Sequence, residues 1–457
     1  MLRLSAGQVE SLWDEVLPGE VRELPEDLEA LDVLLADDAL LAPIAAGWGE
    51  QARSHGRPTI STQTYVRLMV VKHRTGWGYE TLVREVSDSL HLRRLCLIAL
   101  GERVPEESTV RKLTRRLGAS VVNEITRVVI EKAKREKRFR PRAVRIDSTV
   151  VEADVRYPTD SGLALDSARV LAREARKLLV KVGREAGHVR DRSRAIGRRV
   201  RAMTRTLGRR TGERKQQVLE LTEQAGKLVE RSIREAKRLV TVARRRARGR
   251  GAKAKLRQVE RLPQFIERSE QVTEQIRQRM RGERITNRLV SIFDPDARPI
   301  RKGKLGKPNE FGFVAQICEI TENTKTGARG LIIPATSELG NPSEDTLLPD
   351  TVAELQRLGI SLREVALDGG FSVGPSSQAL EPLEPERTFI AGRRQPGSRR
   401  TQRRLARYRT GSEGRISHLK RGYGLRRARL KDHHGMQTWT GWSILTYNLD
   451  TLAIRSN

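Results

Sequence analysis

The 457-residue sequence contains only two cysteines, Cys96 and Cys318. Two thiols are too few for a disulfide framework, and this usage fits a reducing compartment. No cysteine–histidine cluster has the spacing of a zinc site, and the pair His433–His434 fits a solvated turn better than a metal site. Composition therefore argues against disulfide-rich secreted scaffolds and against zinc-dependent folds.

Long apolar runs are also missing. Hydrophobic residues make up 37% and aromatic residues 4% of the chain. No run has transmembrane length, and the N-terminus lacks the pattern of a signal peptide. We therefore expect a cytoplasmic protein with no membrane partner.

Acidic residues are scarce relative to basic ones, with 57 Asp and Glu against 88 Lys and Arg and a formal net charge of +31. A charge of this size indicates a polyanion partner, with nucleic acid as the foremost candidate. The imbalance is uneven, because residues 1–50 hold 2 basic and 12 acidic side chains whereas residues 161–290 hold 37 and 14. An acidic head on a basic body indicates either intramolecular masking or a surface held away from the nucleic acid.

Helical patterns fill the first 135 residues. Residues 1–57 predict an acidic segment of short amphipathic helices, and residues 58–135 predict a helical domain. Within the latter, "TYVRLMVVKHRTGWGYETLVREVS" indicates two helices around a Gly-Trp-Gly turn, as in a helix-turn-helix DNA-binding domain.

A further helix is expected between an N-cap at Ser108 and Gly118. Its apolar residues share one face, so its basic residues fall on the other. Phosphate contact and a solvated charged face explain that basic face equally well. The four basic candidates for DNA contact are Arg111, Lys112, Arg115 and Arg116.

Strand patterns begin at residues 141–155, where Val144 and Ile146 alternate with Arg145, Asp147 and Thr149. Residues 161–287 are then basic and helical. Their apolar stripe looks too thin for a globular core, so they predict long helices folded back as a hairpin or coiled-coil arm.

From residue 288 strands resume: a hairpin built from "EFGFVAQICEIT" and "GARGLIIPATS", a capped helix, and the strand "REVALD". Alternating strands and helices indicate an α/β fold. The expected architecture is a mixed sheet flanked by helices, formed by residues 136–160 and 288–457, with residues 161–287 inserted after the first strand.

Two acidic residues lie in conspicuous surroundings. In "EVALDGGFS" a strand ends at Asp368, followed by two glycines that either make a plain turn or leave room for a DNA backbone. Residues 393–431 hold fifteen Lys or Arg and one acid, Glu413, which is either an ordinary ion-pair partner or a metal ligand.

Asp147, Asp368 and Glu413 together are suited to phosphodiester chemistry. Two Mg²⁺ ions about 4 Å apart neutralise the phosphate and activate a water or a 3′-hydroxyl, and Mg²⁺ needs only a few carboxylates. We therefore predict these three residues as catalytic residues and metal ligands, with Mn²⁺ able to replace Mg²⁺. The acids that compete with them are Glu152, Asp154, Asp160, Asp294, Asp296 and Glu310.

From about residue 58 onward the chain resembles the DDE transposases of bacterial insertion sequences, whose catalytic domain has the RNase H-like fold. The resemblance rests on "VPEESTVRKLTRRL", "VRIDSTVVEA", "VALDGGFS" and "RTGSEGRISHLKRGYGLRRAR". Many members carry Tyr, two residues, Arg, three residues, Glu, six residues, Lys. Arg409, Glu413 and Lys420 keep this spacing, but Ala406 holds the Tyr position and Tyr408 follows two residues later.

The resemblance implies a transposase that binds terminal inverted repeats, cuts DNA and joins 3′-hydroxyl ends to target DNA. It implies DNA contacts by Arg409 and Lys420, with Arg415 and Arg421 of the same block as further candidates. We also expect a homodimer, because two ends are cut in concert, and a bacterial, nucleoid-associated location. Two alternatives remain: an RNase H-like nuclease without strand transfer, and a non-catalytic DNA-binding or architectural protein. The insertion is expected either to grip DNA ends or to pair subunits.

Overall fold

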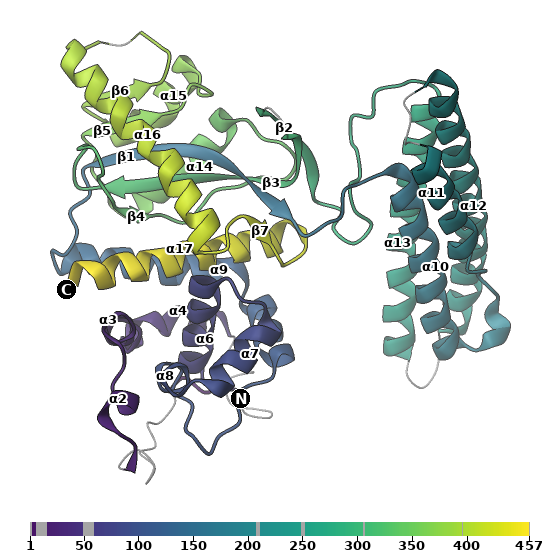
Figure 1. Cartoon of the computed structure of the whole chain (residues 1–457), viewed down its shortest axis with the longest axis horizontal. Helices are drawn as coiled ribbons and strands as arrows, with labels where there is room; N and C mark the ends of the chain where they lie inside the picture. Colours follow the sequence, from purple (N-terminus) through teal and green to yellow (C-terminus); the bar gives the residue numbers. More distant parts are fainter. Residues whose placement is uncertain are drawn as a thin grey trace. The chain divides into compact units, whose positions relative to one another are not determined.

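The computed structural model describes residues 2–5, 16–48, 59–206, 211–247, 252–304, 307–394 and 396–456. By its internal packing the chain divides into two compact units (Figure 1). The first comprises Met1–Asp154 and Gly312–Asn457, and the second comprises Val155–Phe311. The predicted boundary at residues 57 and 58 lies outside the described residues.

A mixed sheet lies at the centre of the first unit. Its strand order is β3-β1-β5-β6, with β4 paired to β3 and β7 paired to β1. β3 is antiparallel to β1, whereas β5 and β6 are parallel to β1 and to each other. The strands are β1 (Ala143–Ala153), β3 (Lys307–Thr321), β4 (Leu331–Ile332), β5 (Glu364–Leu367), β6 (Arg387–Ile390) and β7 (Arg427–Ala428).

Helices cover both faces of this sheet, which confirms the predicted α/β fold with a helix-flanked sheet. Among the described residues, the helices of this unit are α2 (Gly19–Arg22), α3 (Glu26–Leu35), α4 (Ala42–Gly47), α6 (Thr62–Thr75), α7 (Tyr79–Asp88), α8 (Leu90–Leu95), α9 (Glu107–Arg135), α14 (Glu344–Arg357), α15 (Val373–Leu380), α16 (Arg399–Gly422) and α17 (Asp432–Ser456). The prediction that Ser108 is the N-cap of this helix was wrong, because α9 already begins at Glu107 and its N-cap is Glu106. At Gly118, the predicted end of the helix, the helical backbone is interrupted.

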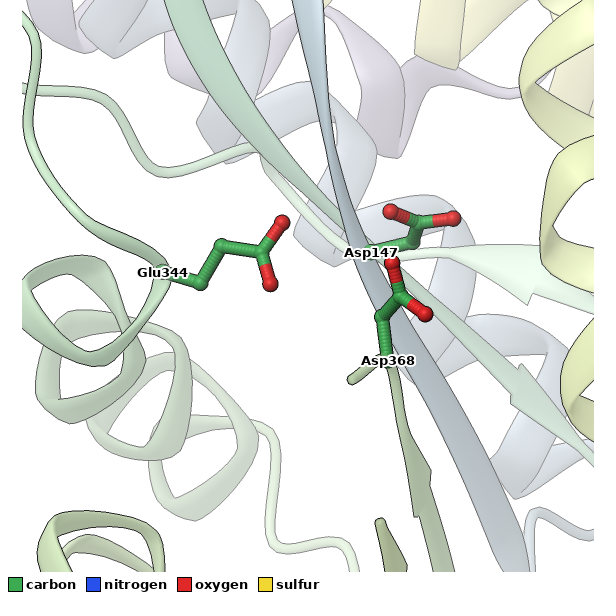
Figure 2. Close-up of side chains that lie close together, drawn as sticks. All are labelled: Asp147, Glu344 and Asp368. Atoms are coloured by element: carbon green, nitrogen blue, oxygen red, sulfur yellow. The ribbon is translucent and has the colours of Figure 1, made fainter. Parts of the chain in front are cut away.

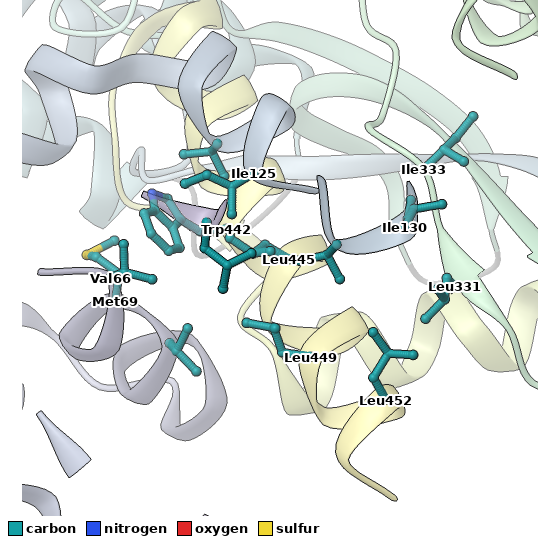
Figure 3. Close-up of a cluster of buried hydrophobic side chains, with 14 of the residues drawn as sticks. Val66, Met69, Ile125, Ile130, Leu331, Ile333, Trp442, Leu445, Leu449 and Leu452 are labelled. Atoms are coloured by element: carbon teal, nitrogen blue, oxygen red, sulfur yellow. The ribbon is translucent and has the colours of Figure 1, made fainter. Parts of the chain in front are cut away.

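One continuous hydrophobic core joins the N-terminal helices to the sheet. Figure 3 shows part of it, where Trp442 and Leu445 of α17 lie near Ile125 of α9 and Met69 of α6. α17 contributes many buried residues because apolar side chains recur along it from Met436 to Ala453. The core therefore makes the helices that precede β1 part of the same packed body as the sheet.

The two sheet faces follow the strand alternation predicted for β1. Val144 and Ile146 of β1 belong to the large core together with Val365 and Leu367 of β5. The opposite face carries Ala143 and Ala366, which pack with Leu405 and Tyr408 of α16. α16 thus lies on the face to which Arg145 and Asp147 belong.

A buried ion network fastens α16 to the sheet. Arg145 of β1 donates through Nε to Glu319 of β3 at 2.7 Å and through Nη1 to the carbonyl of Tyr408 in α16 at 2.9 Å. Arg415 of α16 donates through Nε to the other oxygen of Glu319 at 3.0 Å. All three charged side chains are almost fully buried, so each guanidinium depends on the Glu319 carboxylate for its counter-charge.

The second unit is a helical bundle with its own core, which corrects the prediction of a thin hairpin or coiled-coil arm. Small residues of α12 such as Ala225, Val229 and Ala236 pack with Ile276 and Leu262 of α13 and with Leu171 of α10. Each helix supplies a narrow stripe, and the joint packing of several helices closes a core that no single stripe suggested. The helices are α10 (Asp160–Val182), α11 (Ser193–Thr206), α12 (Gly212–Arg246) and α13 (Ala252–Met280).

A further strand, β2 (Arg298–Lys304), pairs with β3 and was not predicted. Its sequence RPIRKGK is rich in basic residues and lacks the apolar alternation of a half-buried strand. β7, with only two residues, also escaped prediction.

Replacing Glu319 should destabilise the first unit strongly. In Glu319→Gln two buried guanidinium groups lose their counter-charge, so we expect a loss of about 3–5 kcal/mol in the free energy of unfolding. Urea titration followed by tryptophan fluorescence measures it, because the four tryptophans that the structure describes, Trp48, Trp77, Trp439 and Trp442, all belong to this unit. The matched control is the exposed Glu338→Gln, which should change stability by less than about 0.5 kcal/mol. Equal effects of the two variants would contradict the role given to the network.

Candidate functional site

Strand register brings Asp147 and Asp368 together. β1 and β5 pair in parallel, and Ile146 lies opposite Leu367 at the end of the ladder. Asp147 and Asp368 each follow directly after this last pair, so they fall side by side at the same edge. Asp147 is buried, and Asp368 is partly exposed.

A third carboxylate, which sequence reasoning missed, comes from Glu344 at the first turn of α14. One carboxylate oxygen from each of Asp147, Glu344 and Asp368 lies within 4.8 Å of the others (Figure 2). Acidic residues are common in the first turn of a helix because they favour the helix dipole. Glu344 therefore looked like an ordinary helix-start residue. The one feature of the sequence that could have pointed to it is its place on the helix that directly precedes the strand ending at Asp368.

The loop after Asp368 is held against α14 by the neighbouring Asp345. Its carboxylate accepts from the backbone N–H of Ser372 at 3.0 Å and from the Ser376 hydroxyl at 3.4 Å. Gly370 lies in this loop, and a Cβ built on it would come within 2.3 Å of the Glu344 carboxylate. In this structure the glycine thus leaves room for Glu344.

Glu413 is not part of this group of three. It lies in the middle of α16 rather than at the start of a helix, and its side chain is 66% exposed. It accepts from Arg409 Nη1 at 2.9 Å, and Arg409 also donates to Asp368. One guanidinium therefore bridges the second predicted aspartate and the predicted glutamate.

α16 nevertheless approaches the first aspartate closely. The hydroxyl of Ser412, the residue before Glu413, donates to Asp147 Oδ2 at 3.0 Å. This approach needs Gly411, since a Cβ there would come within 1.9 Å of the Arg145 guanidinium. The segment that carries Glu413 is thus held beside Asp147 while the Glu413 carboxylate turns toward Arg409.

The other basic candidates of α16 differ in their surroundings. Arg415 is buried and bound to Glu319, as described above, whereas Arg421 is exposed. Lys420 is half-buried and lies seven residues after Glu413, on the same side of the helix. Tyr408 is buried, with its hydroxyl 2.6 Å from that of Thr321. The DNA-binding roles of Arg409, Arg415, Lys420 and Arg421 stay predictions.

The four basic candidates of α9 are on a separate part of the first unit. Arg111 pairs with Glu107 at 3.0 Å, and Arg116 stacks over the Trp48 ring at 3.8 Å. Lys112 and Arg115 are exposed. Their contact with DNA also stays a prediction.

None of the six competing acids joins the described group of three carboxylates. Glu152 and Asp154, near the far end of β1, pair with Arg427. Asp160 pairs with Arg279 and Arg288 inside the second unit, which also contains Asp294, Asp296 and Glu310.

The three-carboxylate group suits a divalent cation of the Mg²⁺ or Mn²⁺ type. Its donors are hard carboxylate oxygens, and opposite ligands of an ion that binds oxygen at about 2.0–2.1 Å lie about 4.2 Å apart. The oxygens lie within 4.8 Å of one another, so a small side-chain adjustment brings them into range. No other group of this kind occurs in the part of the chain that the structure describes.

The N-terminal half of α16 is fixed by a second ion pair. Arg404 donates to Glu364 of β5 at 2.7 Å, and Thr324 donates to the same carboxylate at 2.8 Å. Burial would raise the pKa of Glu364, but the bonds from Arg404 and Thr324 lower it below its ordinary value. The ionised form of Glu364 is therefore favoured by folding.

Comparison with known proteins relates part of the chain to a protein family. Residues 21–116 match the family model described as "Transposase domain (DUF772)". That match supports a transposase family for this chain. A stretch of 130 residues is 28% identical to the "Uncharacterized protein ORF8 in nfe locus" of Rhizobium meliloti, over 27% of this chain and 63% of that protein. The chain thus covers less than two thirds of the length of this relative. No solved structure matches the chain.

Within the described residues, the helices are all too short or too polar to span a bilayer.

Gly411→Ala should disturb the site through α16. The added methyl collides with a guanidinium held by three hydrogen bonds, so we expect a loss of about 1–3 kcal/mol in unfolding free energy. Gly414→Ala is the matched control, because a Cβ there meets nothing within 4 Å and should stabilise the helix by about 0.5–1 kcal/mol. Urea titrations of the two variants should shift in opposite directions; a loss in both would contradict the close approach.

The ion pair between Glu364 and Arg404 should make the stability of the protein depend on pH. Because the folded pKa of Glu364 is lowered, its contribution is present above the unfolded value of about 4.3 and is lost as pH falls through the folded value. The stability difference between the wild type and Glu364→Gln should therefore be largest near neutral pH and shrink below about pH 4. Urea titrations of both proteins across this range measure it. A difference that is independent of pH would show that the loss is steric.

Proposed function

We propose that this chain is a DNA transposase that cuts the ends of a mobile element and joins the freed 3′-hydroxyl ends to target DNA. The observation that carries the proposal is the convergence of Asp147, Glu344 and Asp368 within 4.8 Å, in a chain whose residues 21–116 match a transposase domain. The mixed sheet with helices on both faces fits the RNase H-like catalytic domain that the motifs suggest. The net charge of +31 fits a DNA partner.

In this proposal Asp147 and Asp368 hold Mg²⁺ at the edge of the sheet, with Glu344 as the third carboxylate of the arrangement seen. The ion, when bound, neutralises phosphate charge and activates water or a 3′-hydroxyl. Ser412 orients Asp147 by donating to its Oδ2. Three carboxylates this close together favour a nearby cation, which offsets their mutual repulsion.

Arg409 supplies that positive charge in the structure and has a second role in the proposal. Its side chain is 13% exposed and lies between Asp368 and Glu413. A DNA phosphate competes for the same guanidinium, since bidentate guanidinium–phosphate pairs are strong. Transfer of Arg409 to a phosphate frees Glu413 to turn toward Asp147, where it would act as the metal ligand that the resemblance implies.

The residue roles can be separated by conservative substitutions. We expect Asp147→Asn and Asp368→Asn to lower DNA cleavage more than 100-fold, because even outer partners of a metal site are worth about 10–100-fold. The substrate is a duplex carrying the DNA that flanks the gene, and gel analysis separates cut from joined products. Glu338→Gln, with an exposed carboxylate outside the site, is the control and should retain activity.

The variants Glu344→Gln and Glu413→Gln test which of these two residues is the third carboxylate of the metal site. Loss of Mn²⁺ binding in Glu344→Gln, measured by calorimetry without DNA, supports its place in the metal set. Loss of cleavage in Glu413→Gln with Mn²⁺ binding retained supports recruitment of Glu413 by DNA. Cleavage that survives in both aspartate variants would overturn the proposal, and cut DNA without joined products would favour a nuclease.

Two DNA ends are cut in concert, so we further propose that the active form is a homodimer. Light scattering of the protein bound to its end DNA measures the stoichiometry. One chain bound to one DNA end under cleaving conditions would contradict it.

A further inference from the structure

The helix α11 of the second unit carries a row of arginines along one side. They occur at spacings of four, three and four residues, which keeps them within one narrow face of a helix. The opposite face holds Ile196 and Met203, which are 0% and 4% exposed. The arginine row, as we name it, consists of the exposed residues Arg194, Arg198, Arg201 and Arg205.

No acidic residue occurs within α11. Among the described residues, none of the four arginines of the row forms an ion pair with a carboxylate. Glu235 and Glu230 of the neighbouring α12 pair instead with Arg192 and Arg277. Like charges three and four residues apart destabilise a helix by about 0.2–0.5 kcal/mol per pair. An external anion would remove this repulsion.

The neighbouring helix α12 enlarges the basic surface. Arg231, Arg234 and Arg238 are exposed and likewise form no ion pair with a described carboxylate. α11 and α12 pack against each other, as the bond from Arg199 to Gln224 shows, and Arg192 just before α11 binds Glu235 of α12. An anion with charges repeated along its length fits such a surface better than a single small ion.

We propose that the arginine row is a docking surface for the phosphate backbone of duplex DNA. The row extends about 16 Å along the helix axis at 1.5 Å per residue, a length of duplex axis over which each strand carries about five phosphates at one per 3.4 Å. The choice of DNA as the anion rests on the proposed function. The surface adds a contact outside the site, made by arginines that read charge rather than sequence.

A second copy of the chain fits the row less well. Two arginine rows repel each other, so a partner copy would have to offer its acidic N-terminal segment. Within that segment Asp27, Asp32 and Asp37 already bind Arg74, Arg67 and Lys132 of the same chain. The role of the insertion left open by the sequence is therefore assigned to DNA rather than to subunit pairing.

The test is the salt dependence of DNA binding by the full chain. The variant replaces all four arginines of the row with Gln, and circular dichroism checks that its helix content is unchanged. The probe is a fluorescent random-sequence duplex of about 30 base pairs, about three turns, in EDTA, with binding followed by anisotropy over a range of salt concentrations. Each lost phosphate contact reduces the slope of log K against log salt by about 0.9.

A charge-matched control removes four cations of the same bundle that are paired with carboxylates whose side chains are 31–78% exposed. It replaces Lys227, Arg246, Arg277 and Arg281 with Gln. We expect the slope to become shallower by about 3–4 in the row variant and by less than about 1 in the control.

Equal changes in the two variants would overturn the proposal, because net charge alone would then explain binding. An unchanged slope in the row variant would overturn it too, and a change in subunit number without a change in slope would identify a pairing surface instead. Asp368→Asn separates the two proposals, since it should stop cleavage and leave the slope intact. A wild type that binds through the row but never cuts DNA would refute the proposed function and leave the docking surface standing.

Discussion

The packing of α16 on the sheet in the first unit depends on one buried carboxylate, Glu319, which binds one arginine of the sheet and one of the helix. Arg145 belongs to the sheet and Arg415 to the helix that covers it. Hydrophobic contact alone would let a helix with so few apolar residues slide or rotate over the strands. The shared carboxylate fixes the position of α16 along β1, and with it the positions of Ser412 and Arg409. The positions of these two α16 side chains beside the carboxylates are thus set by the buried charges of Arg145, Glu319 and Arg415.

The site is assembled from two independent constraints. Parallel pairing between β1 and β5 brings the aspartates together whatever the helices do. The third carboxylate depends on the helices, and two candidates compete for that place. Glu344 lies near the aspartates at the start of α14, where Asp345 holds the loop after Asp368. Glu413 instead pairs with Arg409, which also binds Asp368. The structure therefore groups Glu344, and not Glu413, with the two aspartates.

Much of this could be predicted from sequence because it follows from local pattern. The strand containing Asp147, the strand ending at Asp368 and the capped helix before it have clear periodicity and turn residues. The alternation along β1 also placed Asp147 on the face that α16 covers. Glu344 could not be found this way, because a helix-start acid has an adequate local explanation and its approach to Asp147 depends on tertiary packing. The core of the bundle was missed for a similar reason, since Val229 and Ala236 form a core only when several helices contribute.

The bundle enters and leaves the sheet at adjacent points. Glu152 of β1 lies directly opposite Gly312 of β3 in the antiparallel ladder, and the whole of Val155–Phe311 is inserted where a hairpin turn would otherwise be. Closing so long a loop costs chain entropy, which a compact insertion reduces by bringing its own ends close before the strands meet. A bundle that formed before the strands meet would turn a distant strand pairing into an almost local one. The same adjacency makes this position one where a large module can be gained or lost with little change to the sheet.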